Sequence, residues 1–434
     1  MEGRAVSLTA YWQLVRDNRN FRLLWLAQIV SEIGDWLYAI SIYSLLLQLT
    51  GSARSVALAV VLQVIPQLLV SPSAGVINDR LSRKQVMIFS DVTRAVVVLG
   101  MLLVRTADMV WLLYVLLFLE TVLWGFFEPG RSAVLPNITK GPQVLVANAL
   151  SSTTWSFNLA VGSALGGTAA ALLGRDPVFI LNSASFLFSA LCLRAMRFEE
   201  THVDSSRPFR LREALDFTPV LEGVRYIRGD RRLLSTLMVK AGLGIMGTNL
   251  VILPVFGERV FPVSLGGKLT AERSGMLGMS FLMGSRGVGA LLGPLISGYW
   301  AAHRHERLRL GILLGFLTGL IGYVWLGLAP ALWIACLAIM FAHAGGSTIW
   351  VFSTTLLQEY AEDRFRGRVF SADFSFLVLS MALVSYVAGV AIDWGISVRV
   401  LAILTGLLAA IPLLAWARVL RGWPAAREVR TAQP

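Results

Sequence analysis

Long apolar runs separated by short polar segments repeat along the whole chain. An α-helix of about 20 apolar residues crosses a hydrocarbon layer of roughly 30 Å, and each run reaches about that length. The pattern therefore predicts twelve membrane-spanning helices. They are expected at 22–48, 55–78, 86–104, 110–127, 145–173 and 178–196, and then at 233–256, 274–300, 308–329, 331–357, 369–392 and 397–420.

Composition supports the same fold class. Of the 434 residues, 56% are hydrophobic and 15% are charged, against about 45–50% and 25% in soluble domains. This balance excludes a soluble enzyme, a secreted disulfide scaffold and a disordered chain. Both cysteines, Cys192 and Cys336, fall inside apolar runs, so no disulfide framework or metal site is expected. The net charge of +12 is spread between the runs, which argues for contact with a lipid bilayer and against nucleic acid.

The basic residues also predict the orientation and the domains. The termini and the loops expected on their side carry 28 Lys and Arg, against 7 in the remaining loops. By the positive-inside rule both termini are cytoplasmic, in a multi-pass protein of the cell (inner) membrane. We expect a six-helix bundle in 1–196, a partly amphipathic cytoplasmic linker in 197–232, a second bundle in 233–420 and a cytoplasmic tail in 421–434.

The two halves look like repeats. Arg22 and Arg232, each followed by two leucines, precede Gly34 and Gly244 by the same twelve residues. Related halves of this kind are typical of transporters. The sequence therefore predicts an all-α membrane protein of two pseudo-symmetric six-helix bundles.

The charged loop between the second and third spans reads Gly75-Val-Ile-Asn-Asp79-Arg80-Leu-Ser82-Arg83-Lys84. It resembles the major facilitator superfamily signature G-x-x-x-D-R-x-G-R-[RK], with Ser82 at the second Gly of the pattern. The resemblance implies the major facilitator fold and a loop that gates the cytoplasmic opening, with Asp79 contacting the start of span 11 near Arg368 to Ser371. The gating residues it implies are Gly75, Asp79, Arg80, Arg83 and Lys84.

Further segments are similar to the macrolide and siderophore exporter branch of the drug/proton antiporters. Two departures from the family pattern concern proton coupling. The span 5 segment Gly162 to Gly167 lacks the proline of the antiporter pattern. The arginine that many proton-coupled relatives carry in span 4 is also absent, and Thr121 lies near its expected place. The segments that carry the resemblance are Asn20 to Trp25, Gly34 to Trp36, Ser90 with Asp91 and Arg94, Phe127 to Ser132, and Gly367 to Val369.

Charged residues inside apolar spans are expensive and usually serve a function. Glu32 and Asp35 lie three residues apart in span 1 and share a helix face, which suggests a pair able to exchange a proton. The alternative is that they only hydrogen-bond to neighbouring helices. Glu120 in span 4 is a third carboxylate at similar depth and is expected at the cavity or in the core.

Four more charged residues lie in spans. Arg286 is central in span 8 and is expected to face the substrate cavity, where it pairs with an acid, lines water or meets an anionic substrate. Lys240 in span 7 either serves the cavity or reaches back to the membrane surface. Asp91 and Arg94, near the cytoplasmic end of span 3, are expected to form a structural ion pair tied to the charged loop.

Together these features predict a secondary transporter that exports amphipathic small molecules, such as drugs, macrolides or siderophores, by alternating access. A proton gradient is the expected energy source. We expect a monomer with no cofactor and no enzymatic activity. A lysophospholipid or other lipid flippase, an importer, and a membrane scaffold or sensor on a transporter fold remain alternatives.

Overall fold

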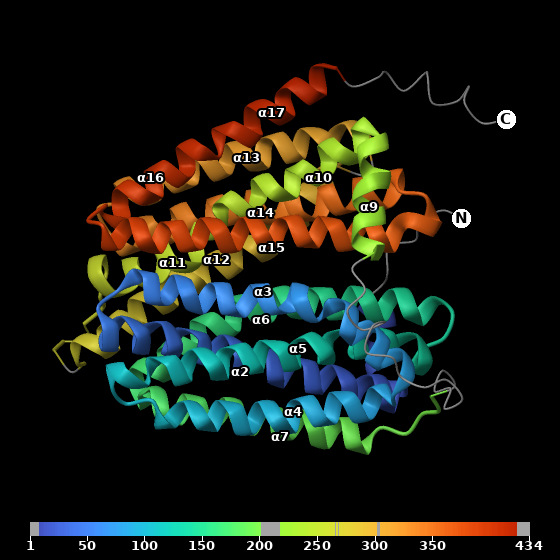
Figure 1. The fold of residues 1–434 in the computed structure, drawn as a ribbon, viewed down its shortest axis with the longest axis horizontal. Coiled ribbons are helices and arrows are strands. Elements are labelled where there is room, and N and C mark those ends of the chain that lie inside the picture. Colours follow the sequence, from blue (N-terminus) through green and yellow to red (C-terminus); the bar gives the residue numbers. More distant parts are fainter. Residues whose placement is uncertain (1–7, 201–217, 265, 268, 302–303, 423–434) are drawn as a thin grey trace.

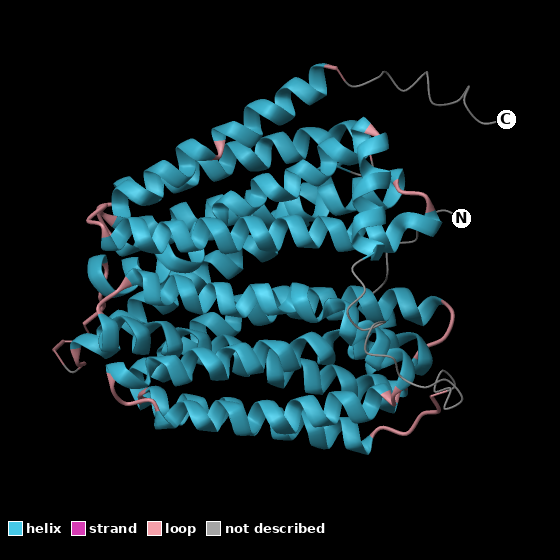
Figure 2. Cartoon of the chain, viewed as in Figure 1, coloured by secondary structure: helices cyan, strands magenta, loops and turns pink. Residues whose placement is uncertain are grey.

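The computed structural model describes residues 8–422 except 201–217, 265, 268 and 302–303. Within this part of the chain, twelve helices are long and apolar enough to cross a membrane, and loops between them are short (Figure 2). This confirms the predicted fold class. Part of the expected linker, 201–217, and most of the expected tail lie outside the described residues.

The N-terminal half forms one layer of the molecule (Figure 1). Within it α2 contacts α6 and α7, α4 contacts α5 and α7, and α3 contacts α5. Its helices are α1 (Leu8–Asp17), α2 (Arg19–Thr50), α3 (Ala53–Arg80), α4 (Arg83–Gly100), α5 (Val110–Ile138), α6 (Pro142–Leu173) and α7 (Arg175–Ala195), with short 3₁₀ turns η1 (Met101–Leu103) and η2 (Ala107–Met109).

The C-terminal half forms the other layer. Its seventh span is not one regular helix, because a 3₁₀ turn and a π-helical turn interrupt it. The elements are α9 (Thr218–Gly229), α10 (Arg231–Gly244), η3 (Ile245–Thr248), α11 (Asn249–Val255), η4 (Phe256–Val260), α12 (Ala271–Ala301), α13 (His305–Leu328), α14 (Leu332–Tyr360), α15 (Asp363–Asp393), α16 (Val398–Leu408) and α17 (Ala410–Arg421).

Local sequence explains where several helices begin. Asn18 and Ser52 cap α2 and α3, since their side chains accept hydrogen bonds from backbone amides in the first turn. Ser82 caps α4 in the same way, accepting from the amide of Gln85 at 3.2 Å. The residue that departs from the superfamily loop signature therefore supplies a helix cap.

The two halves meet along two seams, α6 against α12 and α3 against α15. Close approach needs glycine at both. A Cβ on Gly287 of α12 would collide with the backbone of Ala160 in α6, and one on Gly389 of α15 would lie 2.5 Å from Cβ of Ala57 in α3. Helices of the two halves thus pack almost backbone to backbone.

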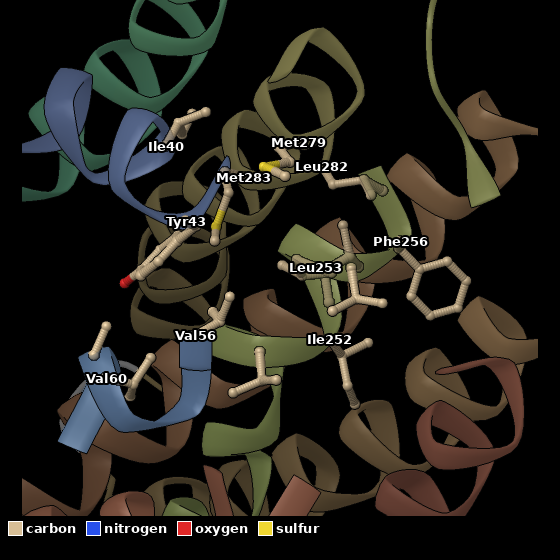
Figure 3. Close-up of a cluster of buried hydrophobic side chains, with 14 of the residues drawn as sticks. Ile40, Tyr43, Val56, Val60, Ile252, Leu253, Phe256, Met279, Leu282 and Met283 are labelled. Carbon is tan, nitrogen blue, oxygen red and sulfur yellow. The ribbon is translucent and has the colours of Figure 1, made fainter. Parts of the chain in front are cut away.

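We call the membrane end that carries α9 the linker end and the opposite end the far end. Towards the far end an apolar cluster draws side chains from both halves, as Figure 3 shows. Val56, Ile252 and Leu253 are fully buried there, so these side chains of the two halves pack together out of contact with water. The cluster includes Ile40, Tyr43, Val56, Val60, Ile252, Leu253, Phe256, Met279, Leu282 and Met283.

Candidate functional site: buried charge clusters between the helices

Arg94 lies at the centre of a group of charged side chains in the N-terminal half. It is eleven residues into α4, about 16 Å along the helix and so near mid-membrane. Its Nη2 lies 2.6 Å from Oε1 of Glu120 on α5 and 3.0 Å from Oδ2 of Asp35 on α2. Oδ1 of Asp91 is farther, at 3.7 Å from Nη1. We call Arg94, Asp35, Asp91 and Glu120 the Arg94 cluster.

This arrangement changes the expected role of Arg94. The prediction paired it with Asp91 near the end of a span, but its shorter contacts cross to two other helices at mid-depth. The ring of Phe186 closes the remaining side, 4.0 Å from the guanidinium carbon. Helix spacing shows which residues share a face, whereas partners on other helices depend on how each helix is rotated.

The Arg94 cluster holds more acids than bases. With all three carboxyls ionised, one guanidinium would leave two excess negative charges inside the protein, and a buried excess of this kind is strongly unfavourable. One bound proton removes one of the two excess charges. The side chain of Asp35 is 26% exposed, against 7% for Glu120 and 0% for Asp91, so Asp35 is the carboxyl that water reaches most readily.

Glu32 has different neighbours from Asp35, although the two were expected to form one pair. Its carboxylate accepts hydrogen bonds from Gln28 at 2.9 Å and from Asn158 of α6 at 2.8 Å. Both partners are neutral amides. No hydrogen bond joins Glu32 to Asp35 among the described residues, so a change of protonation at Glu32 would break no ion pair there.

Lys240 is buried in the C-terminal half and does not reach the membrane surface, so the surface alternative is wrong. Its ammonium lies 2.8 Å from Oδ2 of Asp373 on α15 and donates to Thr354 at 3.1 Å. The ring of Trp350 lies 4.0 Å away. Sequence reasoning missed Asp373, although an acid inside the predicted span 369–392 was a signal for it.

Arg286 lies at the centre of α12, fifteen residues from either end. Its guanidinium faces Trp36 of the opposite half, 6.0 Å from the ring centre. Within the described part of the chain, Nη1 makes its one hydrogen-bond contact with the sulfur of Met283, at 3.8 Å, and Nε is buried without a partner. Among the described residues no carboxylate contacts it, so none of the acids proposed as its partner pairs with it here.

The charged loop is held mainly by its own half. Arg83 donates to the backbone oxygens of Asn78 and Ala133, at 3.2 and 3.1 Å. Asp79 is 74% exposed and lies 3.5 Å from Arg83. Among the described side chains, no ion pair or hydrogen bond joins Asp79 to the start of span 11 near Arg368 to Ser371.

Other residues of this region bind locally as well. Arg368, near which Asp79 was expected, instead pairs with Glu222 of α9 at 2.7 Å. Lys84 donates to the carbonyl of Met196 at 2.7 Å. A Cβ added at Gly75 would meet none of the described atoms within 4 Å, and Arg80 ends α3 beside Asp79.

The far end carries contacts between the halves. The carboxylate of Asp393, at the end of α15, accepts from the amides of Ala53 at 2.8 Å and Arg54 at 3.2 Å, and also from the hydroxyl of Ser52. Arg175 pairs with Glu272 at 3.5 Å. Among the described residues no group of three or more acidic, His or Cys side chains could hold a metal.

Comparison with known proteins places the chain in a family. The model of the family described as transmembrane secretion effector matches residues 11–431. The uncharacterized MFS-type transporter YfiS of Bacillus subtilis is 27% identical over 398 residues, covering 89% of this chain and 90% of the relative. Macrolide efflux protein A of Streptococcus pyogenes is 24% identical over 374 residues, covering 84% and 87%.

A third relative, the multidrug efflux pump Tap of Mycolicibacterium fortuitum, is 25% identical over 363 residues, covering 80% of this chain and 83% of the relative. Among solved structures, the nucleoside transporter NupG superposes with a TM-score of 0.74 at 9% identity, covering 92% of this chain and 99% of the other. A peptide transporter of the POT family in complex with 5-aminolevulinic acid gives 0.71 at 12% identity, covering 92% and 95%. These structures share the fold.

Proposed function

The chain belongs to the transmembrane secretion effector family, within the efflux branch of the major facilitator superfamily, and on that premise we propose that it is a proton-coupled exporter of amphipathic small molecules. Relatives named for macrolide efflux, bacilysin export and multidrug efflux support export. The observation that carries the coupling proposal is the Arg94 cluster, where three acids surround one base near mid-membrane.

In the proposed mechanism the halves rock along the seams α6–α12 and α3–α15. The linker end is the cytoplasmic side, consistent with the excess of basic residues in the loops there, and this conformation is closed at the far end. Substrate enters from the linker end. When Asp35 takes up a proton, the ion pair between Asp35 and Arg94 weakens. When Asp35 releases the proton, the ion pair forms again.

Proteoliposomes with an imposed proton gradient test the coupling. Erythromycin and a lysophospholipid are suitable probes, because they represent the drug and the lipid alternatives. Asp35→Asn should abolish uphill accumulation while downhill movement of the same probe continues, since the substitution keeps the side-chain size but removes the titrating group. Asp17→Asn, at an exposed position outside the membrane spans, is the matched control.

Three outcomes would distinguish the proposed function from its alternatives. Uphill transport with unchanged pH dependence in Asp35→Asn would place coupling elsewhere, with Glu32 and Glu120 next in order. Movement of the lysophospholipid alone would favour a flippase. Absence of any gradient-dependent movement in the unmodified chain would favour the scaffold or sensor alternative.

A further inference from the structure

Among the described residues, Arg286 is a cation without a counter-charge in its surroundings. The guanidinium remains charged at any accessible pH, yet the one hydrogen-bond contact that the described part of the chain gives it is a thioether sulfur, which is a weak acceptor. The mid-membrane acids are engaged by other groups: Asp35 by Arg94, and Glu32 by two amides. No carboxylate in the described part of the protein therefore compensates the charge of Arg286.

The residues around Arg286 come from both halves. Trp36 and Tyr43 lie seven residues apart on α2, which places them on one face of that helix. Tyr43 donates to Oε1 of Gln63 on α3 at 2.8 Å. In the C-terminal half the hydroxyl of Tyr323 lies 3.3 Å from Nε2 of His343. Both tyrosines are close enough to interact electrostatically with the guanidinium.

We propose that Arg286 binds the anionic group of the transported molecule, so that the substrates are amphipathic organic acids. This inference rests on the proposed transport function and adds the substrate class. A carboxylate can accept two hydrogen bonds from the planar guanidinium, including one from the buried Nε that has no partner. The aromatic faces of Trp36 and Tyr43 then contact the apolar body of the molecule.

The position also suits alternating access. Arg286 lies one residue before Gly287, where α12 packs against the backbone of Ala160 in α6, so rocking along this seam moves the guanidinium relative to Trp36. An anion held by Arg286 against Trp36 contacts both halves at once. Substrate binding can therefore influence the relative position of the halves.

Calorimetric binding to the purified full-length chain in lipid nanodiscs tests the substrate class. The probes are naphthaleneacetate, indoleacetate and dodecanoate, each compared with its primary amide, which has nearly the same shape without the charge. We expect at least one acid to bind about tenfold or more tightly than its amide. Arg286→Gln should remove that preference, and Arg286→Lys should retain part of it.

A matched control separates this effect from net charge. Arg105 lies at the far end and pairs with Asp176, so Arg105→Gln should keep the preference for the acid. Because Arg286 is unpaired, we also expect Arg286→Gln to fold with undiminished thermal stability in the absence of probe. A large loss of stability would show a structural role and overturn the proposal.

The remaining outcomes are equally decisive. Equal binding of every acid and its amide, or a preference that survives Arg286→Gln, would overturn the assignment. Arg286-dependent binding of lysophosphatidylglycerol without binding of the soluble acids would assign the anionic group to a lipid headgroup instead. Gradient-dependent flux of erythromycin and of the same acids is measured separately in proteoliposomes. Flux of erythromycin without Arg286-dependent binding of any acid would overturn the anion assignment alone. Arg286-dependent binding of an acid without flux of either probe would overturn the exporter proposal alone.

Discussion

Removal of the Asp393 carboxylate should weaken the closure of the far end. Asp393 ends α15, and its oxygens accept hydrogen bonds from the first amides of α3 in the opposite half, at 2.8 and 3.2 Å. The hydroxyl of Ser52 donates to the same carboxylate. A negative charge at a helix N-terminus satisfies otherwise unpaired amides and interacts favourably with the helix dipole. The contact therefore stabilises the conformation seen here.

The size of the effect follows from these contacts. Loss of an N-terminal capping side chain costs about 0.5–2 kcal/mol. Asp393 is exposed, so solvent screening favours the lower half of that range, about 1 kcal/mol. Asp393→Ala should therefore shift the equilibrium towards far-end opening by roughly fivefold. Asp393→Asn should shift it less, because the amide oxygen still accepts one hydrogen bond.

Cysteine accessibility measures this shift. Val56 is fully buried in the apolar cluster at the far end, so Val56→Cys, with Cys192 and Cys336 replaced by Ser, should react slowly with a membrane-impermeant maleimide. Asp393→Ala should raise its labelling rate from the far end only. Asp176→Ala removes a charge at the same end within one half, and an equal rate in that variant would refute the reasoning.

Two further predictions concern the other polar contacts. Asp79→Ala should insert and express normally but transport more slowly, because the loop can no longer hold the linker end closed. Unchanged cysteine labelling of the linker-end opening would contradict this. Lys240→Met alone should destabilise the protein by about 3–5 kcal/mol by leaving Asp373 buried and unpaired. In thermal unfolding the double variant Lys240→Met/Asp373→Leu should recover most of that loss, and no recovery would refute the pairing argument.

The number and order of the membrane helices could be predicted because apolar length alone decides whether a helix crosses the bilayer. The ends could not. Span 4 was expected to end at residue 127, yet α5 continues to Ile138 through Pro129 and Pro136. An apolar run measures the lipid-embedded part of a helix, whereas this helix extends into a more polar segment that still supports helical hydrogen bonds.

The site residues could be nominated from sequence, but their partners could not. A charge inside a membrane span is costly to bury, so Arg94, Lys240 and Arg286 could all be predicted as site residues from their positions alone. Which acid each one meets depends on the rotation and neighbours of its helix. Arg94 was paired with Asp91 because they are three residues apart, while the closer partners, Asp35 and Glu120, lie on other helices.

Two acids, Asp393 of α15 and Asp79 of α3, lie near the C-terminal ends of helices that pack against each other across the two halves. The helices run antiparallel, so the C-terminal end of each lies beside the N-terminal end of the other. At the far end Asp393 of α15 caps α3. At the linker end Asp79 of α3 is exposed, and the superfamily resemblance implies that it contacts the start of α15. Because rocking that closes one end separates the other, the two contacts are expected to alternate, with each stabilising one of the two states.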